Sequence, residues 1–306
     1  MSKQLINFIE QNKSEIEEAL RVNLPLTFLP AARSLNEALE YAVFPGGKRL
    51  RPVLTLLACD LVGASRRLGL TIACAVEFLH CSSLILDDLP SMDDALVRRN
   101  RAALHLVFGE GIAVLAAVAL LNQSYALFAR ADENGGRRSV AESLVIEAAR
   151  CVGTDGMIGG QAIDLETQTG DGDAEFLDCR DLKTAALMRL MMTAGAIACG
   201  ADDECLSALT EFGECFGKAY QLNDDLTDNL DANLAIGKTT GQDIRHSRVT
   251  GVSALGETGA RNLAESLIEQ GAARLFAKFG ERPETLMLRD AAYLTGSFKD
   301  NFAAKV

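Results

Sequence analysis

Two groups of closely spaced aspartates are the residues of this chain best suited to chemistry. The first, DDLPSMDD at residues 87–94, places four carboxylates within eight residues. Such charges repel one another unless water or a cation screens them. Mg²⁺ prefers carboxylate oxygens and keeps open positions for a phosphate ligand. Asp87 and Asp93 are therefore candidate magnesium ligands, although an isolated pair of aspartates is more often a solvated acidic loop.

A second aspartate group lies far downstream, in YQLNDDLTD at residues 220–228. Asp224 and Asp228 are four residues apart, so in a helix they project from one face. Like charges at this spacing destabilise an isolated helix, which favours a functional reason for them. Metal sites in helical bundles are built from side chains on facing helices. Together the two groups predict one metal site between two helices.

Basic side chains accompany both aspartate groups. Lys48 and Arg51 follow a Gly-Gly turn at the start of an expected helix, where backbone N–H groups favour anions. Arg98 and Arg99 come directly after the first aspartate group, and arginine offers two parallel donors to a phosphate. Lys183-Thr184 and Lys238 lie in the second half of the chain. A single basic residue is most often a surface charge, but this combination predicts a site for phosphate groups.

The elements that must position these residues are predicted to be helices. No proline occurs between Pro90 and Pro283, and Ala, Leu, Glu and Arg dominate that span, a composition typical of one all-helical body. We therefore expect an all-α fold in a single domain over residues 1–306. The expected helices cover residues 3–22, 34–44, 52–61, 68–88, 109–131, 139–168, 174–199, 203–213, 214–229, 258–279 and 284–296.

Local signals refine three of these helices. Ser34 and Glu37 have the spacing of a capping box at the start of the second. The helix over 68–88 must end near Asp87, because Pro90 cannot continue it. Four glycines, at 153, 156, 159 and 160, fall inside the helix expected over 139–168. Glycine is unfavourable in a helix, so four together indicate close packing or a narrow wall that a ligand passes.

Composition excludes several other classes of protein. The net charge of −12 leaves no broad basic face, which argues against nucleic acid as a partner. The eight cysteines contain no CxxC pair, which predicts free thiols in a reducing compartment. Residues 1–22 lack an apolar signal core, and no run reaches the roughly 18 uninterrupted apolar residues of a membrane span. We expect a soluble cytoplasmic protein with no transmembrane segment.

Six stretches of the chain resemble the all-trans isoprenyl diphosphate synthases, which include the farnesyl and geranylgeranyl diphosphate synthases. They match in order and spacing over about residues 34–250, and they are GGKRLRP (46–52), DDLPSMDDALVRR (87–99), GGQAIDL (159–165), KT (183–184), YQLNDDLTD (220–228) and GKTTGQD (237–243). The resemblance implies a large helical bundle of the isoprenoid synthase type around a central apolar cavity, usually as a homodimer. It also implies a Mg²⁺-dependent reaction that joins isopentenyl diphosphate to an allylic diphosphate and releases pyrophosphate.

The same resemblance implies a role for each matching residue. The ligands of isopentenyl diphosphate would be Lys48, Arg51, His80 and Arg99. The Mg²⁺ ions, three with bound diphosphate, would be held by Asp87, Asp88 and Asp93 on one side and by Asp224, Asp225 and Asp228 on the other. The allylic diphosphate or its leaving group would contact Arg98, Lys183, Thr184, Gln221 and Lys238, of which Arg98, Lys183 and Lys238 are the catalytic candidates. Arg248 is a further candidate for substrate binding.

Several positions depart from the pattern of this family. The stretch Asn100-Arg101-Ala102-Ala103 replaces a usual Gly-Lys-Pro-Thr, and Ser247-Arg248 replaces a Gly-Lys pair, so that Arg248 keeps the charge. Three single positions also differ. Leu86 stands where the family often has His, Val118 where many members have Asp, and Ala185 where Gly is usual. None removes an expected metal ligand, so we expect activity, with substrate affinity or product length open to change.

Product length is predicted from the small residues before the first aspartate group. Ser82 and Ser83 lie about one helical turn before Asp87 and point into the expected channel. A bulky ring at position 82 would stop growth at a C15 product, and serine is small. We expect a C20 product, geranylgeranyl diphosphate, with C15 and C25 as alternatives. The channel floor would lie deeper, at Leu79 or near Leu115 and Val118 on a facing helix.

Three rival functions remain open at this point. A class I terpene cyclase also ionises a diphosphate, but neither it nor a two-headed squalene-type synthase needs an isopentenyl diphosphate site, so Lys48, Arg51 and His80 speak against both. A non-catalytic subunit that modulates an active synthase belongs to a different class of function. Such a subunit can lose its aspartates, whereas both groups survive here.

Overall fold

The computed structural model describes residues 3–131, 138–166, 182–230 and 251–302, although the side chains of residues 138–139, 227–230, 251, 253 and 295–302 lie outside the description. The first half contains α1 (Lys3–Asn23), a 3₁₀ turn η1 (Pro30–Ala32), α2 (Arg33–Val43), α3 (Leu50–Leu61), α4 (Arg66–Asp87), α5 (Leu104–Phe108) and α6 (Glu110–Phe128). The second half contains α7 (Arg138–Val152), α8 (Met157–Glu166), α10 (Leu182–Cys199), α11 (Asp203–Leu230), α13 (Gly251–Phe279) and α14 (Pro283–Phe302). Within the described ranges the strands are a two-residue hairpin, β1 (Val97–Arg98) and β2 (Arg101–Ala102). The all-α prediction is confirmed.

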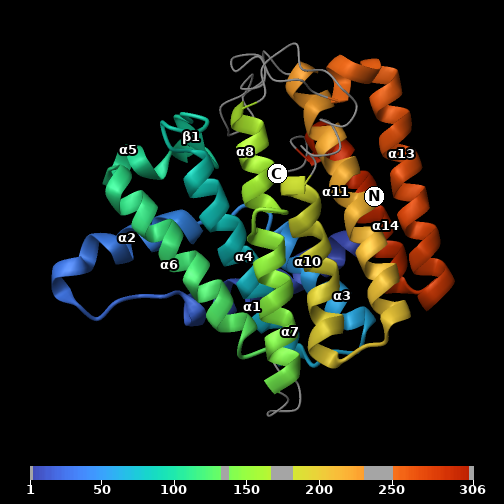
Figure 1. Ribbon diagram of the computed structural model, residues 1–306, viewed down its shortest axis with the longest axis horizontal. Helices are drawn as coiled ribbons and strands as arrows, with labels where there is room; N and C mark the ends of the chain where they lie inside the picture. Colours follow the sequence, from blue (N-terminus) through green and yellow to red (C-terminus); the bar gives the residue numbers. More distant parts are fainter. Residues whose placement is uncertain (1–2, 132–137, 167–181, 231–250, 303–306) are drawn as a thin grey trace.

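The helices are arranged around α4 and α10. Figure 1 shows α4, α8 and α10 in the middle, with α2, α5 and α6 on one side and α11, α13 and α14 on the other. Helix α4 packs against α3 and α6, while α10 packs against α3, α7, α8 and α11. Helix α13 covers α11, and α14 contacts both. The expected central apolar channel stays a prediction.

Helix α4 is buried along most of its length because it is apolar on all sides. All residues from Ile72 to Ser82 are buried, including Phe78 and Leu79. A helix with an apolar stripe on one side would instead leave its other face in water. Neighbours therefore cover α4 all round, and it delivers Asp87 to the end of the bundle.

Seven of the eight cysteines are described, and all seven are free thiols; Cys179 lies outside the described residues.

The single helix expected over 139–168 is wrong, because the chain breaks there into α7 and α8. Residues 153–156 form a turn in which the N–H of Gly156 donates to the carbonyl of Gly153 at 3.0 Å. A Cβ atom at Gly156 would lie 2.1 Å from the carbonyl oxygen of Cys151, so only glycine fits this turn. Gly160 does serve close packing as expected, since a Cβ there would lie 2.6 Å from the backbone nitrogen of Lys183.

The two helices expected over 203–213 and 214–229 are one continuous helix, α11. Its glycines mark close approach to α10 rather than a helix end. A Cβ atom at Gly217 would lie 2.4 Å from Cα of Ala185, and one at Gly213 would lie 2.7 Å from Cα of Arg189. Helices α10 and α11 are therefore in backbone contact beside the residues of the second aspartate group.

Several helix ends also differ from the expectation. The capping box is wrong: α2 begins at Arg33 after Ala32, with no side-chain cap. The side chain of Asn36 instead exchanges two hydrogen bonds with the backbone of Thr27, at 2.8 and 2.9 Å, and so holds the segment before the helix. Helix α6 ends at Phe128 rather than 131, α13 begins at Gly251 and kinks at Gly256, and α14 continues to Phe302.

Three helices are long and apolar enough to cross a membrane when judged by length and composition alone: α4, α6 and α10. The sequence had instead predicted no run long enough for a membrane span. Neighbours in the bundle bury 78% of the apolar window of α4 and 67% of that of α10, but only 39% of that of α6. Helix α6 thus carries an apolar face that the single chain leaves open.

Candidate active site

The first aspartate group forms a tight loop at the end of α4. Helix α4 ends at Asp87, and the N–H of Asp93 donates to the carbonyl of Asp87 at 2.9 Å. The N–H of Asp94 similarly donates to the carbonyl of Leu89 at 3.0 Å. These two bonds fold the chain back on itself, as the proline in the loop predicted. Asp93 therefore returns to the end of the helix that carries Asp87.

Lys183 connects this loop to α10. Its ammonium group contacts the carboxylate of Asp87 at 2.9 Å and also donates to Oε1 of Gln161 on α8. The amide of Gln161 in turn faces Sδ of Met92, within the aspartate loop, at 3.7 Å. The close contact at Gly160 is what lets α8 bring Gln161 to Lys183. Gln161 had no predicted role, although it lies inside the matching GGQAIDL stretch.

Thr184, the next residue, reaches the second aspartate group. Its hydroxyl donates to Oε1 of Gln221 at 3.1 Å, and the amide of Gln221 donates to Oδ1 of Asp225 at 3.0 Å. Asp225 is buried, and Asp224 is partly exposed beside it. Consecutive residues of α10 thus contact Asp87 on one side and Gln221 on the other. The structure brings the two aspartate groups to one site.

Arg98 is paired with Asp88. Its guanidinium Nε lies 2.9 and 3.1 Å from the two carboxylate oxygens, and Nη2 donates to Oδ1 as well. Burial raises the pKa of Asp88 above its usual value, and Arg98 opposes that rise. Arg98 belongs to β1 of the small hairpin, whose turn residues Arg99 and Asn100 both have positive φ, at 53° and 60°. This is the backbone of a two-residue hairpin turn, and it lets the side chains of the adjacent Arg98 and Arg99 point in different directions.

Arg51 and His80 form a second polar group beside the aspartates. Nη1 of Arg51 lies 3.2 Å from Nε2 of His80, and its guanidinium lies 5.6 Å from the ring centroid of Tyr220, next to Gln221. A guanidinium can only donate, so Nε2 is the acceptor and the ring is neutral. Burial, followed by the charges of nearby arginines, lowers the pKa of His80 well below its usual value. The Nε atom of Arg51 is buried and has no partner among the described residues.

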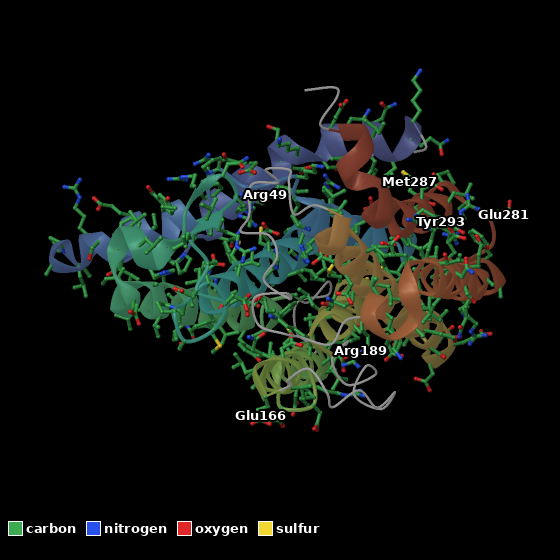
Figure 2. The ribbon with its side chains drawn as sticks, turned by 90° about the horizontal axis from the view of Figure 1, so that it is seen from above. Arg49, Glu166, Arg189, Glu281, Met287 and Tyr293 are labelled. Atoms are coloured by element: carbon green, nitrogen blue, oxygen red, sulfur yellow. The ribbon has the colours of Figure 1, made fainter. Side chains whose placement is uncertain are left out.

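Arg49, between the two expected ligands Lys48 and Arg51, is a residue that sequence reasoning missed. Seen from above, it lies among the helices, whereas Glu166 and Glu281 lie near the edges (Figure 2). Its guanidinium contacts Glu17 of α1 and Glu77 of α4. Glu77 was recognisable in the sequence as the acidic residue inside the apolar run that leads to Asp87. Lys48 itself lies exposed at the surface of this loop.

A pocket opens between α2, α4 and the hairpin. Tyr41, Leu84 and Ile85 form apolar parts of its wall, and Arg99 and Arg101 are among its polar residues. Arg101, one of the departures from the family pattern, donates to the carbonyl of Phe44 at 2.9 Å and lies 3.5 Å from the ring centroid of Tyr41. The unusual Asn100–Ala103 stretch therefore supports the hairpin by packing against α2.

The remaining predicted site residues fall into three groups. Lys238 and Arg248 lie outside the described residues, as does the side chain of Asp228. Ser82 is buried, and the hydroxyl of Ser83 donates to the carbonyl of His80 in its own helix at 2.9 Å. The channel floor expected at Leu115 and Val118 is wrong for the single chain, because these residues are 55% and 53% exposed. Leu79 is buried, as a floor residue would be.

The acidic residues fit magnesium by their chemistry. Among the described residues, no group of three or more His, Cys, Asp or Glu side chains is arranged to hold a metal. Asp87 and Asp88 are instead paired with Lys183 and Arg98. Mg²⁺ is usually bound by one or two carboxylates together with substrate phosphates rather than by an all-protein cage. Carboxylates on two helices, with phosphate-binding cations beside them, match that mode.

The comparisons with known proteins agree with this geometry. Residues 32–274 match the family model described as polyprenyl synthetase. The chain is 35% identical over 288 residues to a chloroplastic geranylgeranyl pyrophosphate synthase of Catharanthus roseus, which is 94% of this chain and 78% of that protein. It superposes with a TM-score of 0.84 on an FPP/GFPP synthase from Zymomonas mobilis, at 32% identity over 96% of this chain and 100% of that one.

A third similar protein carries ligands. It is a geranyltransferase from Helicobacter pylori complexed with magnesium and isoprenyl diphosphate, with a TM-score of 0.78 and 30% identity over 97% of this chain and 98% of that one. The chain belongs to the polyprenyl synthetase family. The expectations of a helical isoprenoid synthase fold and of a short-chain prenyl diphosphate synthase are confirmed at that level, and magnesium in the Helicobacter structure supports the use of Mg²⁺.

The buried neutral His80 predicts a specific pH dependence of stability. Its folded pKa is lowered, so the unfolded chain binds one more proton below about pH 6.5 and stability falls as the pH drops through that value. Between about pH 7.5 and about pH 5.5, urea unfolding should show the wild type losing about 1 kcal/mol more than a His80→Gln variant. Equal losses in the two proteins would contradict a neutral buried imidazole.

Proposed function

We propose that this protein condenses isopentenyl diphosphate with allylic diphosphates of C5 to C15 and releases geranylgeranyl diphosphate, a C20 product. The observation that carries the proposal is the junction at α10, where Lys183 contacts Asp87 and Thr184 contacts the Gln221–Asp225 pair. One diphosphate placed at this junction would meet carboxylates for metal on both sides and fixed cations as well. The Catharanthus relative bears the name of a geranylgeranyl synthase.

The chemistry requires charge to be neutralised where a bond breaks. Cleavage of the allylic C1–O bond leaves an allylic cation and a pyrophosphate, whose developing negative charge must be stabilised. Arg98 and Lys183 hold positive charge beside Asp88 and Asp87, where that pyrophosphate would lie. Bound Mg²⁺, which we propose as three ions held by the two aspartate groups, would neutralise further charge on the diphosphate.

The second substrate then reacts with the cation. The π electrons of isopentenyl diphosphate form the new bond to C1, and a proton is lost from the resulting tertiary cation. We assign that proton to an oxygen of the departing pyrophosphate, because Nε2 of His80 already accepts from Arg51 and is not free to take it. Lys48, Arg51, His80 and Arg99 form that second subsite in the proposal. Water must be excluded until the new bond has formed.

The second diphosphate subsite distinguishes this proposal from its rivals. A terpene cyclase has no second diphosphate to bind, yet Arg51 presents a buried Nε with no partner in the described part of the chain. A non-catalytic subunit has no need for the linked aspartate groups around Lys183 and Thr184. We also propose that residues 1–306 form one domain, since α1 packs against α3, α4 and α14. The free buried cysteines favour a reducing compartment, and we propose the cytoplasm.

We further propose that the protein acts as a homodimer through α5 and α6. Val114, Leu115 and Val118 lie on one face of α6 and are exposed, and Leu106 and Val107 of α5 are exposed as well. Large contiguous apolar patches of this kind mark interaction sites. We call these five residues the α5–α6 apolar face. A second copy is the occupant we favour, because the family resemblance implies a homodimer and because this face is the part of an apolar helix that the chain itself leaves open.

Activity should depend on both aspartate groups. With Mg²⁺, radiolabelled isopentenyl diphosphate and a C5, C10 or C15 primer, the wild type is expected to give labelled C20 product. Asp87→Asn and Asp224→Asn should each lower kcat by roughly 10²- to 10³-fold, because charge stabilisation at the leaving group is lost. Asp203→Asn, exposed at the other end of α11, is the matched control with wild-type turnover. Full activity in Asp87→Asn would remove the basis of the proposal.

Product length should respond to position 82. Ser82→Tyr places a ring on the buried face of α4 and is expected to shorten the main product from C20 to C15. Ser82→Ala, which adds no bulk, should leave the product unchanged. The products are hydrolysed to alcohols and sized by chromatography. An unchanged product in active Ser82→Tyr would show that this side chain does not face the growing chain.

Assembly should depend on the α5–α6 apolar face. Sedimentation equilibrium is expected to give twice the chain mass of 32.7 kDa for the wild type. A Leu115→Glu/Val118→Glu variant should sediment as a monomer, because carboxylates would be buried without partners. Ile146→Glu on α7 changes an equally exposed apolar residue outside this face and should remain dimeric. A monomeric wild type would refute the dimer.

A further inference from the structure

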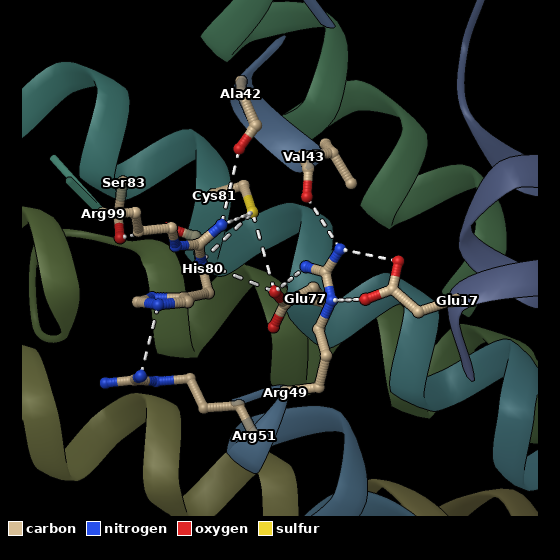
Figure 3. Close-up of polar contacts among 10 residues, drawn as sticks. All are labelled: Glu17, Ala42, Val43, Arg49, Arg51, Glu77, His80, Cys81, Ser83 and Arg99. Atoms are coloured by element: carbon tan, nitrogen blue, oxygen red, sulfur yellow. Dashed lines mark hydrogen bonds and ion pairs between the residues drawn. The ribbon is translucent and has the colours of Figure 1, made fainter. Parts of the chain in front are cut away.

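A single buried carboxylate, Glu77 of α4, joins the two basic segments expected to bind isopentenyl diphosphate. Its Oε1 atom lies 2.5 Å from Nη1 of Arg49 and 3.6 Å from Nη2 of Arg99. The side chain of Glu77 is only 3% exposed, and Figure 3 shows it between the two arginines. It does not face solvent, so its contacts are with the protein. Glu77 is not among the residues expected to bind the substrates.

The contact with Arg49 holds the loop that carries Lys48 and Arg51. Arg49 has a left-handed backbone, with φ of 52°, and comes directly before α3. Its fully buried guanidinium also contacts Glu17 at 2.7 Å and donates to the carbonyl of Val43 at 2.7 Å. Burial alone would lower the pKa of Arg49, but the carboxylates of Glu17 and Glu77 raise it, so the charge is kept. A buried guanidinium with its donors occupied has one position, and it fixes the chain on either side.

The loop is shaped to admit this guanidinium. A Cβ atom at Gly46 would lie 1.9 Å from Cζ of Arg49. Glycine at this position therefore leaves space for the side chain of Arg49 to enter the core. The Gly-Gly turn of the motif thus has a packing role in addition to any contact with an anion, and that role serves Arg49.

The contact with Arg99 acts on the other basic segment. Arg99 also approaches the carbonyl of Ala42 at 3.5 Å, and both of its Nη atoms lie 4.0 Å from Sγ of Cys81. The thiol of Cys81 lies 3.8 Å from the same Oε1 atom of Glu77. These contacts are longer than those of Arg49, so Arg99 is held mainly by charge. His80, one helical turn from Glu77, shares the same segment of α4 (Figure 3).

We propose that Glu77 is a positioning residue for isopentenyl diphosphate, which acts through Arg49 on Lys48 and Arg51 and directly on the guanidinium of Arg99. The inference rests on the proposed function, because it assumes that these residues bind that substrate. Glu17 provides the contrast. It shares Arg49 with Glu77 but makes no ion pair with Arg99 in the described part of the chain, and it is partly exposed. A general loosening of the fold would follow from the loss of either carboxylate, whereas selective misplacement of both basic segments follows only from the loss of Glu77.

The test separates the two substrates kinetically. Glu77→Gln keeps the size of the side chain and removes its charge. The KM for isopentenyl diphosphate is expected to rise roughly tenfold or more, because ligands displaced by about 1 Å lose much of their effect. The KM for the allylic primer, measured at saturating isopentenyl diphosphate, should stay close to that of the wild type. Glu77→Asp keeps the charge but has a shorter side chain. Its KM for isopentenyl diphosphate should therefore fall between those of the wild type and Glu77→Gln.

The matched control is Glu17→Gln, which leaves Arg49 in contact with Glu77 and should change neither KM appreciably. If Glu77→Gln does not fold, Glu77→Asp provides the same comparison with Glu17→Gln. The proposal is overturned by a folded Glu77 variant with an unchanged KM for isopentenyl diphosphate. Equal rises in both KM values, or an equal effect of Glu17→Gln, would overturn it too. Failure of the wild type to consume isopentenyl diphosphate would instead reject the proposed function itself.

Discussion

The structure depends on compensating many charges at one end of an otherwise apolar bundle. Asp87 and Asp88 lie at the end of a helix that is buried on all sides, and each is held by a cation from a different element, Lys183 or Arg98. Removing one partner from a buried ion pair costs about 3–5 kcal/mol, because the other charge is left without compensation. The same pairs that stabilise the folded chain therefore keep a phosphate-binding set of cations next to a metal-binding set of carboxylates.

Close backbone packing sets the distance between the two aspartate groups. The glycines at 160 and 217 let α8 and α11 approach α10 at Lys183 and Ala185, so the three helices are locked together beside the site. Sites built on rigid helices hold their side chains more accurately than sites on loops. The family usually has glycine where Ala185 stands, and here the space for its methyl group is provided by Gly217 instead. Gly217 of α11 thus makes room for the alanine at position 185.

The chemistry of the site was easier to predict from the sequence than its supporting contacts. Asp87 was recognisable as one of four carboxylates within eight residues, whereas the roles of Lys183 and Gln221 were implied by the family resemblance. The pairing of Asp88 with Arg98 was not, because it depends on a hairpin turn with two positive φ angles at residues that are not glycine. The predicted helix boundaries were wrong where a glycine could either end a helix or serve packing within one. In the 153–156 turn it ends a helix, and at positions 213 and 217 it serves packing within one.

The burial of apolar residues was also only partly predictable, since a helical period does not say which neighbour covers a face. Leu115 and Val118 read as interior residues in an almost wholly apolar helix, yet they are exposed because α6 has α4 on only one side. Glu77 shows the opposite case, a charged residue drawn into the core because two arginines from distant segments meet it there. Burying a charge is costly unless it is paired. An acidic residue within an apolar helix therefore indicates that its partner cations need a fixed position, and here the charges of those cations also help to lower the pKa of His80.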